Sequence, residues 1–121
     1  MAGIEVKSTS SPDETRPFKD GKGQAAIVNV NGSPVLYGTF EPGWRWSEHV
    51  KPIAGTDSCQ ATHFIYGISG RMHVVMDDGA EADVGPGDVM WIGPGHDAWV
   101  VGDEAFVGVD WGGASNYARP S

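Results

Sequence analysis

Short runs of apolar residues, separated by residues typical of turns, recur along most of the chain. In several runs apolar and polar positions alternate; between 71 and 76, Met72, Val74 and Met76 fall on one face and Arg71 and His73 on the other. A period of two predicts β-strands. We expect strands at 26–30, 35–40, 44–50, 59–69, 71–76, 89–92, 96–101 and 105–111.

Residues that favour turns lie between these runs. Asn31-Gly32-Ser33 predicts a hairpin turn, because asparagine and glycine adopt positive φ at little cost. We find no convincing helical period and no internal repeat of about 20–50 residues. Many short strands joined by turns are typical of a β-sandwich or a small barrel.

Composition strengthens this all-β interpretation. The 121 residues suit a single domain, and they include thirteen Val and six Ile but one Leu. Leucine is a strong helix former, whereas Val and Ile suit strands. We expect a mostly flexible N-terminal arm at 1–24 that has room for one strand, with Ile4 and Val6 as its buried candidates, a barrel at 25–112 and a frayed C-terminal tail at 113–121.

The charge balance bears on partners and location. Eight basic and sixteen acidic residues give a net charge of −8, which would repel phosphate backbones and anionic lipid, so we expect no nucleic-acid or membrane partner. The first residues lack a secretory signal pattern. The single cysteine, Cys59, excludes an intrachain disulfide. A cytoplasmic protein is therefore expected.

Three segments carry a more specific pattern. Gly43 is followed after five residues by His49; His63-Phe-Ile-Tyr-Gly-Ile-Ser-Gly70 is an apolar strand that ends at a glycine; and Gly87-Asp88 precedes an apolar strand and then Pro94-Gly95-His96. Over roughly residues 35–110, these segments resemble the two motifs of the cupin family. The resemblance implies an all-β fold, a double-stranded β-helix or jelly-roll (cupin) barrel.

The positions at which cupins place their metal ligands are altered in this chain. Lys51 stands where the second histidine of the first motif is usual, and thirteen residues separate His49 from His63. His63 occupies the position of the family's glutamate. In the second motif Ala98 occupies the usual histidine position, and His96 comes two residues earlier.

Four residues nevertheless form a candidate ligand set: His49, Cys59, His63 and His96. Cys59 and His63 are four apart in a predicted strand and therefore share a face, and His96 shares the face of the family's histidine position. Imidazole and thiolate suit a divalent metal ion such as Zn, Fe, Ni, Mn or Cu. The alternative is that the cysteine merely packs and the histidines bond the backbone. His73 falls on the opposite face and is not a candidate.

The resemblance implies two alternative functions. One is a metal-dependent enzyme, of dioxygenase or isomerase type, that acts on a small organic substrate. The other is a non-catalytic protein that binds or senses a small ligand in the barrel. Whether purified protein holds a stoichiometric metal distinguishes the two.

We also expect a homodimer, because open sheet edges need cover. If His49 faces the barrel interior, alternation directs Trp44 and Trp46 outward. There they would form either a dimer interface or ordinary packing between sheets. The N-terminal arm is a further candidate cover for the edges.

Overall fold

The computed structural model describes residues 3–114 and 117–119. Its strands are β1 (Glu14–Pro17), β2 (Gly23–Val30), β3 (Ser33–Phe40), β4 (His63–Ser69), β5 (Met72–Met76), β6 (Glu81–Val84), β7 (Val89–Ile92), β8 (His96–Val100) and β9 (Phe106–Asp110). The short helices are η1 (Lys19–Gly21), α1 (Trp46–His49) and α2 (Lys51–Ala54). No helix in this described part of the chain is long and apolar enough to cross a membrane.

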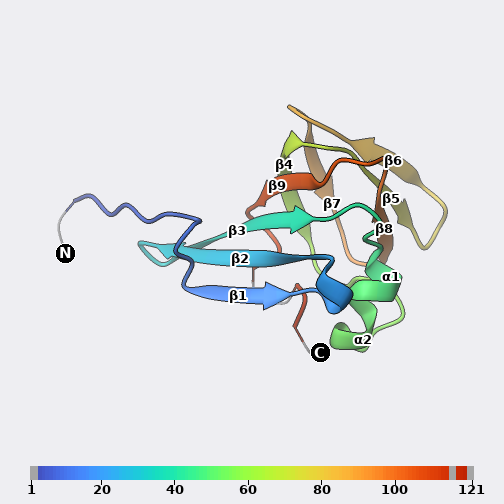
Figure 1. The fold of residues 1–121 in the computed structure, drawn as a ribbon, viewed down its shortest axis with the longest axis horizontal. Helices are drawn as coiled ribbons and strands as arrows, with labels where there is room; N and C mark the ends of the chain where they lie inside the picture. Colours follow the sequence, from blue (N-terminus) through green and yellow to red (C-terminus); the bar gives the residue numbers. More distant parts are fainter. Residues whose placement is uncertain (1–2, 115–116, 120–121) are drawn as a thin grey trace.

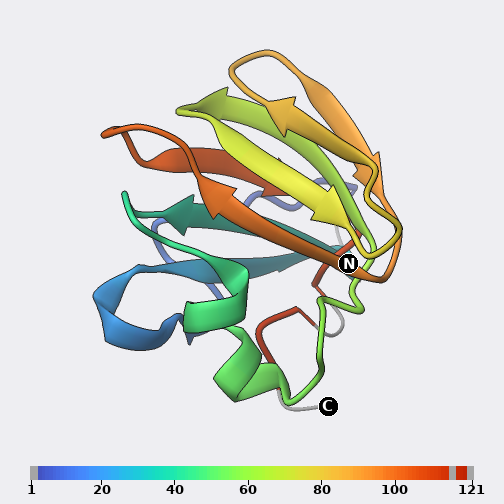
Figure 2. The ribbon, with the colours of Figure 1, turned by 90° about the vertical axis from the view of Figure 1, so that its right-hand side faces the viewer.

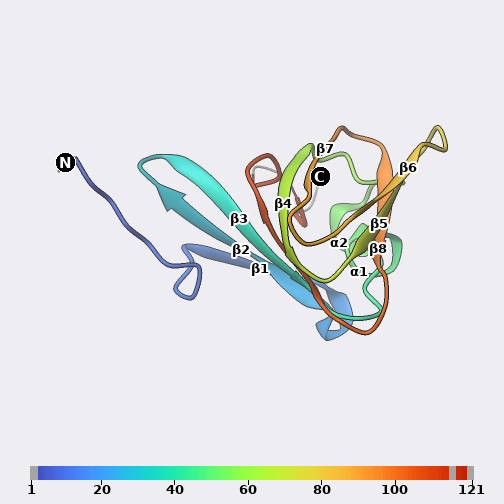
Figure 3. The same cartoon turned by 90° about the horizontal axis from the view of Figure 1, so that it is seen from above.

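The strands form two antiparallel sheets that face each other (Figures 1 and 3). The larger sheet has the order β1-β2-β3-β9-β4-β7, and the smaller has the order β6-β5-β8. In the larger sheet β9 lies between β3 and β4, although it is the last strand in chain order. The all-β fold class is therefore confirmed.

The hairpin between β2 and β3 follows the predicted turn. Asn31 and Gly32 have φ angles of 49° and 78°, both in the left-handed region that a tight hairpin of this kind requires. The strands then pair without interruption from Val30 opposite Ser33 to Gly23 opposite Phe40. Turn chemistry and strand register therefore agree at this site.

Alternation along the strands decides which side chains enter the interior. On β4, His63, Ile65 and Gly67 are buried, whereas Phe64 and Tyr66 are exposed. The same alternation on β8 and β9 buries His96, Ala98 and Val100 and then Phe106, Gly108 and Asp110. Two histidines and an aspartate are thereby directed into a largely apolar core.

The predicted strand at 44–50 is wrong. The chain forms helix α1 instead, and Arg45, in an extended conformation, is its N-cap. The backbone N–H of His49 donates to the Arg45 carbonyl, and that of Val50 donates to the Trp46 carbonyl. Strand alternation therefore does not apply, and Trp44 and Trp46 face inward, only 2% and 1% exposed. These two tryptophans pack inside the barrel and are not available as an interface.

Parts of the N-terminal arm and of the C-terminal tail pack against the barrel, and the buried residues of the arm are not the expected ones. Strand β1 lies within the arm and pairs with β2, and Phe18 is buried, whereas Ile4 and Val6 are exposed. Residues 3–12 run away from the body of the molecule (Figure 1). Of the tail, the described residues Ala114, Tyr117 and Ala118 are buried. Figure 2 shows this segment folding back beneath the barrel. Burial of the large ring of Tyr117 is favourable, and this free energy opposes fraying of the chain end.

Candidate metal centre

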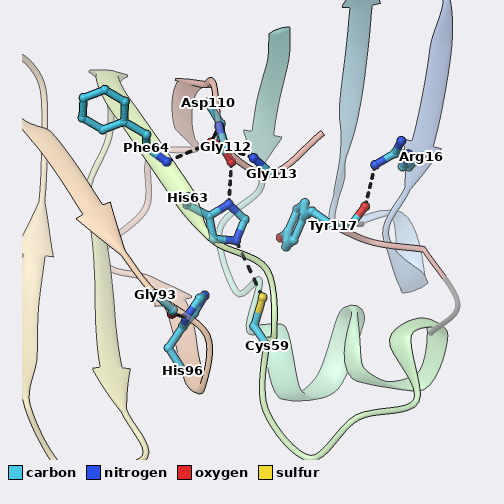
Figure 4. Close-up of polar contacts among 10 residues, drawn as sticks. All are labelled: Arg16, Cys59, His63, Phe64, Gly93, His96, Asp110, Gly112, Gly113 and Tyr117. Carbon is cyan, nitrogen blue, oxygen red and sulfur yellow. Dashed lines mark hydrogen bonds and ion pairs between the residues drawn. The ribbon is translucent and has the colours of Figure 1, made fainter. Parts of the chain in front are cut away.

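Cys59, His63 and His96 bring their side chains together between the two sheets (Figure 4). All three are buried, and their sulfur and nitrogen atoms lie within 4.8 Å of one another. His63 begins β4 in the larger sheet and His96 begins β8 in the smaller one. Cys59 is held beside His96 because its amide donates to the His96 carbonyl at 2.7 Å. The structure thus gathers three of the four residues that the sequence singled out.

His49, the fourth candidate, lies apart from this cluster. Its Nδ1 is 3.0 Å from the Arg45 amide nitrogen, and its Nε2 is 3.9 Å from a carboxylate oxygen of Asp20. The predicted strand would have carried His49 along the interior face, but helix α1 turns it toward η1. The geometry therefore leaves a cluster of one thiol and two imidazoles.

His73 lies on the outer face of β5, where alternation placed it. Its two ring nitrogens bond different carboxylates, Asp83 at 2.6 Å and Glu81 at 2.8 Å, both on the neighbouring strand β6. Both nitrogens are therefore occupied, and this histidine plays no part in the buried cluster.

Each clustered imidazole is held through its Nδ1 atom. The Nδ1 of His96 is 2.8 Å from the Gly93 carbonyl oxygen, which can only accept, so this nitrogen carries the hydrogen and Nε2 carries a lone pair. The Nδ1 of His63 is 2.5 Å from Asp110 Oδ2, and its Nε2 lies 3.6 Å from Cys59 Sγ. Both rings therefore present Nε2 to the centre of the cluster.

Asp110 belongs to the candidate site, and the sequence analysis did not single it out. One carboxylate oxygen bonds His63, while the other accepts amide hydrogens from Phe64 at 3.0 Å, Gly112 at 2.8 Å and Gly113 at 3.1 Å. Gly113 must lack a side chain here, because a Cβ would come within 2.5 Å of the Asp110 carboxylate. An aspartate followed closely by Gly-Gly at a strand end was the available signal, and alternation on β9 would have turned it inward.

The charges of the clustered side chains affect one another's pKa values. Burial raises the pKa of the Cys59 thiol, but His63 and His96 more than offset this and lower it from 9.0 to about 6. Burial lowers the pKa of His63, but Asp110 and Cys59 raise it from 6.5 to about 9. The metal-free protein therefore favours a thiolate beside a protonated imidazole, and a cation that binds here displaces that proton.

A small cavity adjoins the cluster. Its volume is about 30 Å³, and its lining is mostly apolar apart from His63, His96, Asp110 and Tyr117. The ring of Tyr117 meets that of His63 edge to face, with centroids 4.8 Å apart. A wider groove of about 300 Å³ shares Val74, Met90 and Ile92 with the cavity. The cluster thus has a small space beside it and a wider groove nearby.

Two polar atoms near this cavity lack partners. The indole nitrogens of Trp44 and Trp46 are buried without a hydrogen-bond acceptor, and both residues line the cavity. A buried donor without an acceptor costs about 1–3 kcal/mol, so such groups normally meet a water or a ligand. A water or ligand oxygen in contact with these nitrogens would satisfy them.

Comparison with known proteins bears on the fold. No protein-family profile and no curated protein matches the sequence. A double-stranded beta-helix protein from Klebsiella pneumoniae is 22% identical, with a TM-score of 0.59 over 94% of this chain and 93% of its own. A cupin 2 conserved barrel domain protein from Salinispora arenicola is 20% identical, with a TM-score of 0.55 over 92% of this chain and 89% of its own.

An enzyme of known activity has the same architecture. Oxalate decarboxylase from Lactobacillus farciminis is 16% identical, with a TM-score of 0.58 over 86% of this chain. The match covers 32% of that enzyme, so this chain spans about a third of its length. The two facing sheets and these structural likenesses together show that the chain folds as a cupin, a double-stranded β-helix barrel.

Proposed function

We propose that the chain binds one divalent transition metal ion through Cys59, His63 and His96 and presents it to a small organic molecule in the cavity. The observation that carries this proposal is the orientation of the two imidazoles. Asp110 and the Gly93 carbonyl occupy both Nδ1 atoms, so both Nε2 atoms and the thiol meet at one buried point. Such outer hydrogen bonds commonly fix histidine ligands.

The donor atoms fit a metal ion. At a tetrahedral ion, bonds of about 2.3 Å to sulfur and 2.1 Å to nitrogen separate the two donors by about 3.6 Å. The distance from Cys59 Sγ to His63 Nε2 is 3.6 Å. One thiolate and two imidazoles favour Zn, Fe, Ni or Cu over the harder Mn. Three protein ligands also leave a position for another molecule, as in catalytic sites.

The bound metal would supply Lewis acidity toward an oxygen of the ligand. The chain's own residues divide the remaining tasks. Asp110 orients His63 and balances its charge. The indole N–H groups of Trp44 and Trp46 provide donors for ligand oxygen, and the apolar lining together with Tyr117 excludes water. This arrangement supports binding of a small oxygen-bearing molecule whose apolar part lies along the adjoining groove.

Metal content of the purified protein tests the proposal. We expect elemental analysis to find a single transition metal ion per chain, and Cys59→Ser, His63→Ala and His96→Ala each to remove most of it. Replacement by Co²⁺ should produce a thiolate charge-transfer band that Cys59→Ser abolishes. His73→Ala is the surface control and should retain the metal, and His49→Ala should retain it too. Metal-free protein that also fails to bind Zn²⁺ or Co²⁺ in calorimetry would overturn the proposal.

A non-catalytic binding function is the second candidate, and one observation favours it. Among the described residues that line the cavity, Tyr117 is the only titratable one besides the clustered histidines and Asp110, and burial raises its pKa well above the ordinary value. These residues thus offer no separate general base near neutral pH. Incubating metal-loaded protein with a panel of small carboxylates and sugars, followed by NMR, separates turnover from saturable binding.

A further inference from the structure

The outer surface of strands β4 and β7 is strongly apolar. Six large side chains are between 43% and 68% exposed there, and we call them the β4–β7 face: Phe64, Tyr66, Ile68, Val89, Trp91 and Trp111. Alternation explains their position, since their strand neighbours His63, Ile65 and Ile92 point inward. None of the six belongs to the cluster or lines its cavity, although Trp91 also lines the adjoining groove.

Strand register makes the face continuous. Phe64 lies opposite Trp91 and Tyr66 opposite Val89 in the pairing of β4 with β7. Trp111 follows β9 on the other side of β4, and its ring centroid is 6.2 Å from that of Phe64. Five of the six side chains are therefore neighbours in one patch, and Ile68 follows Tyr66 by two residues on β4, where the pairing with β9 shifts register.

The patch is large for a monomer. Large apolar side chains that are half exposed, each with roughly 150–250 Å² of surface, give a patch of about 600 Å². That is at the upper end of what single soluble proteins expose, about 300–600 Å². A stable interface covers about 800 Å² on each partner, so the face supplies most of what one needs.

We infer that the β4–β7 face joins two copies of this chain about a two-fold axis. The chain carries a net charge of −8, so two copies repel each other over most of their surfaces. None of the six residues is charged, and the copies can approach here without burying carboxylates. In a two-fold dimer the same patch of each copy contacts its counterpart. An apolar patch without charges suits such a contact, because it carries no charge pattern that would require a different partner.

The side chains of β7 are the most exposed part of the face. This strand ends the larger sheet, and Val89 and Trp91 are 63% and 68% exposed. Packing two such sheets face to face covers these side chains together with the ring of Trp111.

Charge substitutions on the face provide the test. Light scattering and sedimentation of the full chain should give a dimer, and Trp91→Glu or Phe64→Glu should raise its dissociation constant by at least about 30-fold, the effect of losing a central anchor. Val101→Glu is the matched control, because Val101 is 41% exposed on a different part of the surface. Circular dichroism should show that all three variants stay folded.

The N-terminal segment is the competing contact, because Ile4 and Val6 are 80% and 85% exposed. A dimer that Trp91→Glu and Phe64→Glu leave intact, but that Ile4→Glu with Val6→Glu dissociates, would overturn the inference in favour of that segment. A monomer at all concentrations up to millimolar would overturn it as well. Slower hydrogen exchange of the β7 amides as concentration rises is the result that supports it.

Discussion

The buried carboxylate of Asp110 accepts hydrogen bonds from four groups of the site. It contacts the imidazole of His63, the amide at the second residue of β4, and the two glycine amides that follow β9. Hydrogen bonds from three backbone N–H groups satisfy one carboxylate oxygen, and the other oxygen orients His63. Burial of the carboxylate is tolerable only because these partners are all present.

Replacing Asp110 with Asn should weaken metal binding more than folding. The variant keeps the shape of the side chain but loses the charge that holds His63, so we expect metal affinity to fall about 10–100-fold. Competition with a chromophoric chelator measures this affinity. Asp83→Asn, which alters a surface carboxylate, is the control, and an unchanged affinity in Asp110→Asn would contradict the role assigned to Asp110.

His73 should titrate above the usual pH range for histidine. The hydrogen bond that His73 donates to Asp83 is the main cause that raises its pKa above 6.5; desolvation opposes this rise, and a second hydrogen bond, donated to Glu81, adds to it. Because the pKa of His73 is higher in the folded than in the unfolded chain, its interactions with the two carboxylates stabilise the fold fully below about pH 6.5. This stabilisation is lost as the pH rises through the folded pKa. NMR titration of the ring protons should show the raised midpoint, and Asp83→Asn should lower it.

Among the structural elements, most strands were predictable, but β6 was not expected and the strand expected at 44–50 is helix α1 instead. Alternation correctly predicted that His63 and His96 point inward, because successive side chains of a strand point to opposite faces of its sheet. Helix α1 has four residues, too few to show a helical period, so the same rule misplaced His49 and turned Trp46 the wrong way. The convergence of Cys59 with the histidines was predicted, but for the wrong reason: β4 begins at His63, and Cys59 stands before it in an isolated bridge with His96. Tyr117 was not predicted, because its burial depends on the chain folding back after β9, whereas Asp110 lies on β9 and alternation would have turned it inward.

The C-terminal segment should contribute substantially to stability. Tyr117 packs against His63 and Phe18, and its carbonyl accepts a hydrogen bond from the buried Arg16 guanidinium at 2.9 Å. We expect Tyr117→Ala to lower the free energy of unfolding by about 3–5 kcal/mol, as other buried aromatic truncations do. Urea unfolding measures the loss. Tyr117→Phe should retain most of the stability, and Ile4→Ala, at an exposed site, should have almost no effect.

In the whole molecule, the candidate metal centre connects the two sheets. His63 belongs to the larger sheet, His96 belongs to the smaller, and Cys59 precedes β4 while pairing with His96. A cation held by all three would fasten the sheets at one end of the barrel. Because such a site is lost on unfolding, its binding free energy adds to stability.

Metal should therefore raise the melting temperature. At a free concentration of about 100 times the dissociation constant, binding adds about 2.7 kcal/mol. For a domain of this size that corresponds to a shift of about 10 °C. Differential scanning fluorimetry with Zn²⁺ and with a chelator should show the shift in the native chain and in His73→Ala. The same shift in His96→Ala would show that the metal binds elsewhere.

The place of β9 between β3 and β4 has a consequence for how the molecule assembles. The hairpin of β2 and β3 closes over a two-residue turn, but β3 cannot gain its second neighbour until a strand some seventy positions further along the chain arrives. Pairings between such distant segments slow folding. During synthesis, β3 and β4 therefore wait with unpaired edges, and Asp110 reaches His63 only in the final step. Binding competence should be the last property that the growing chain acquires.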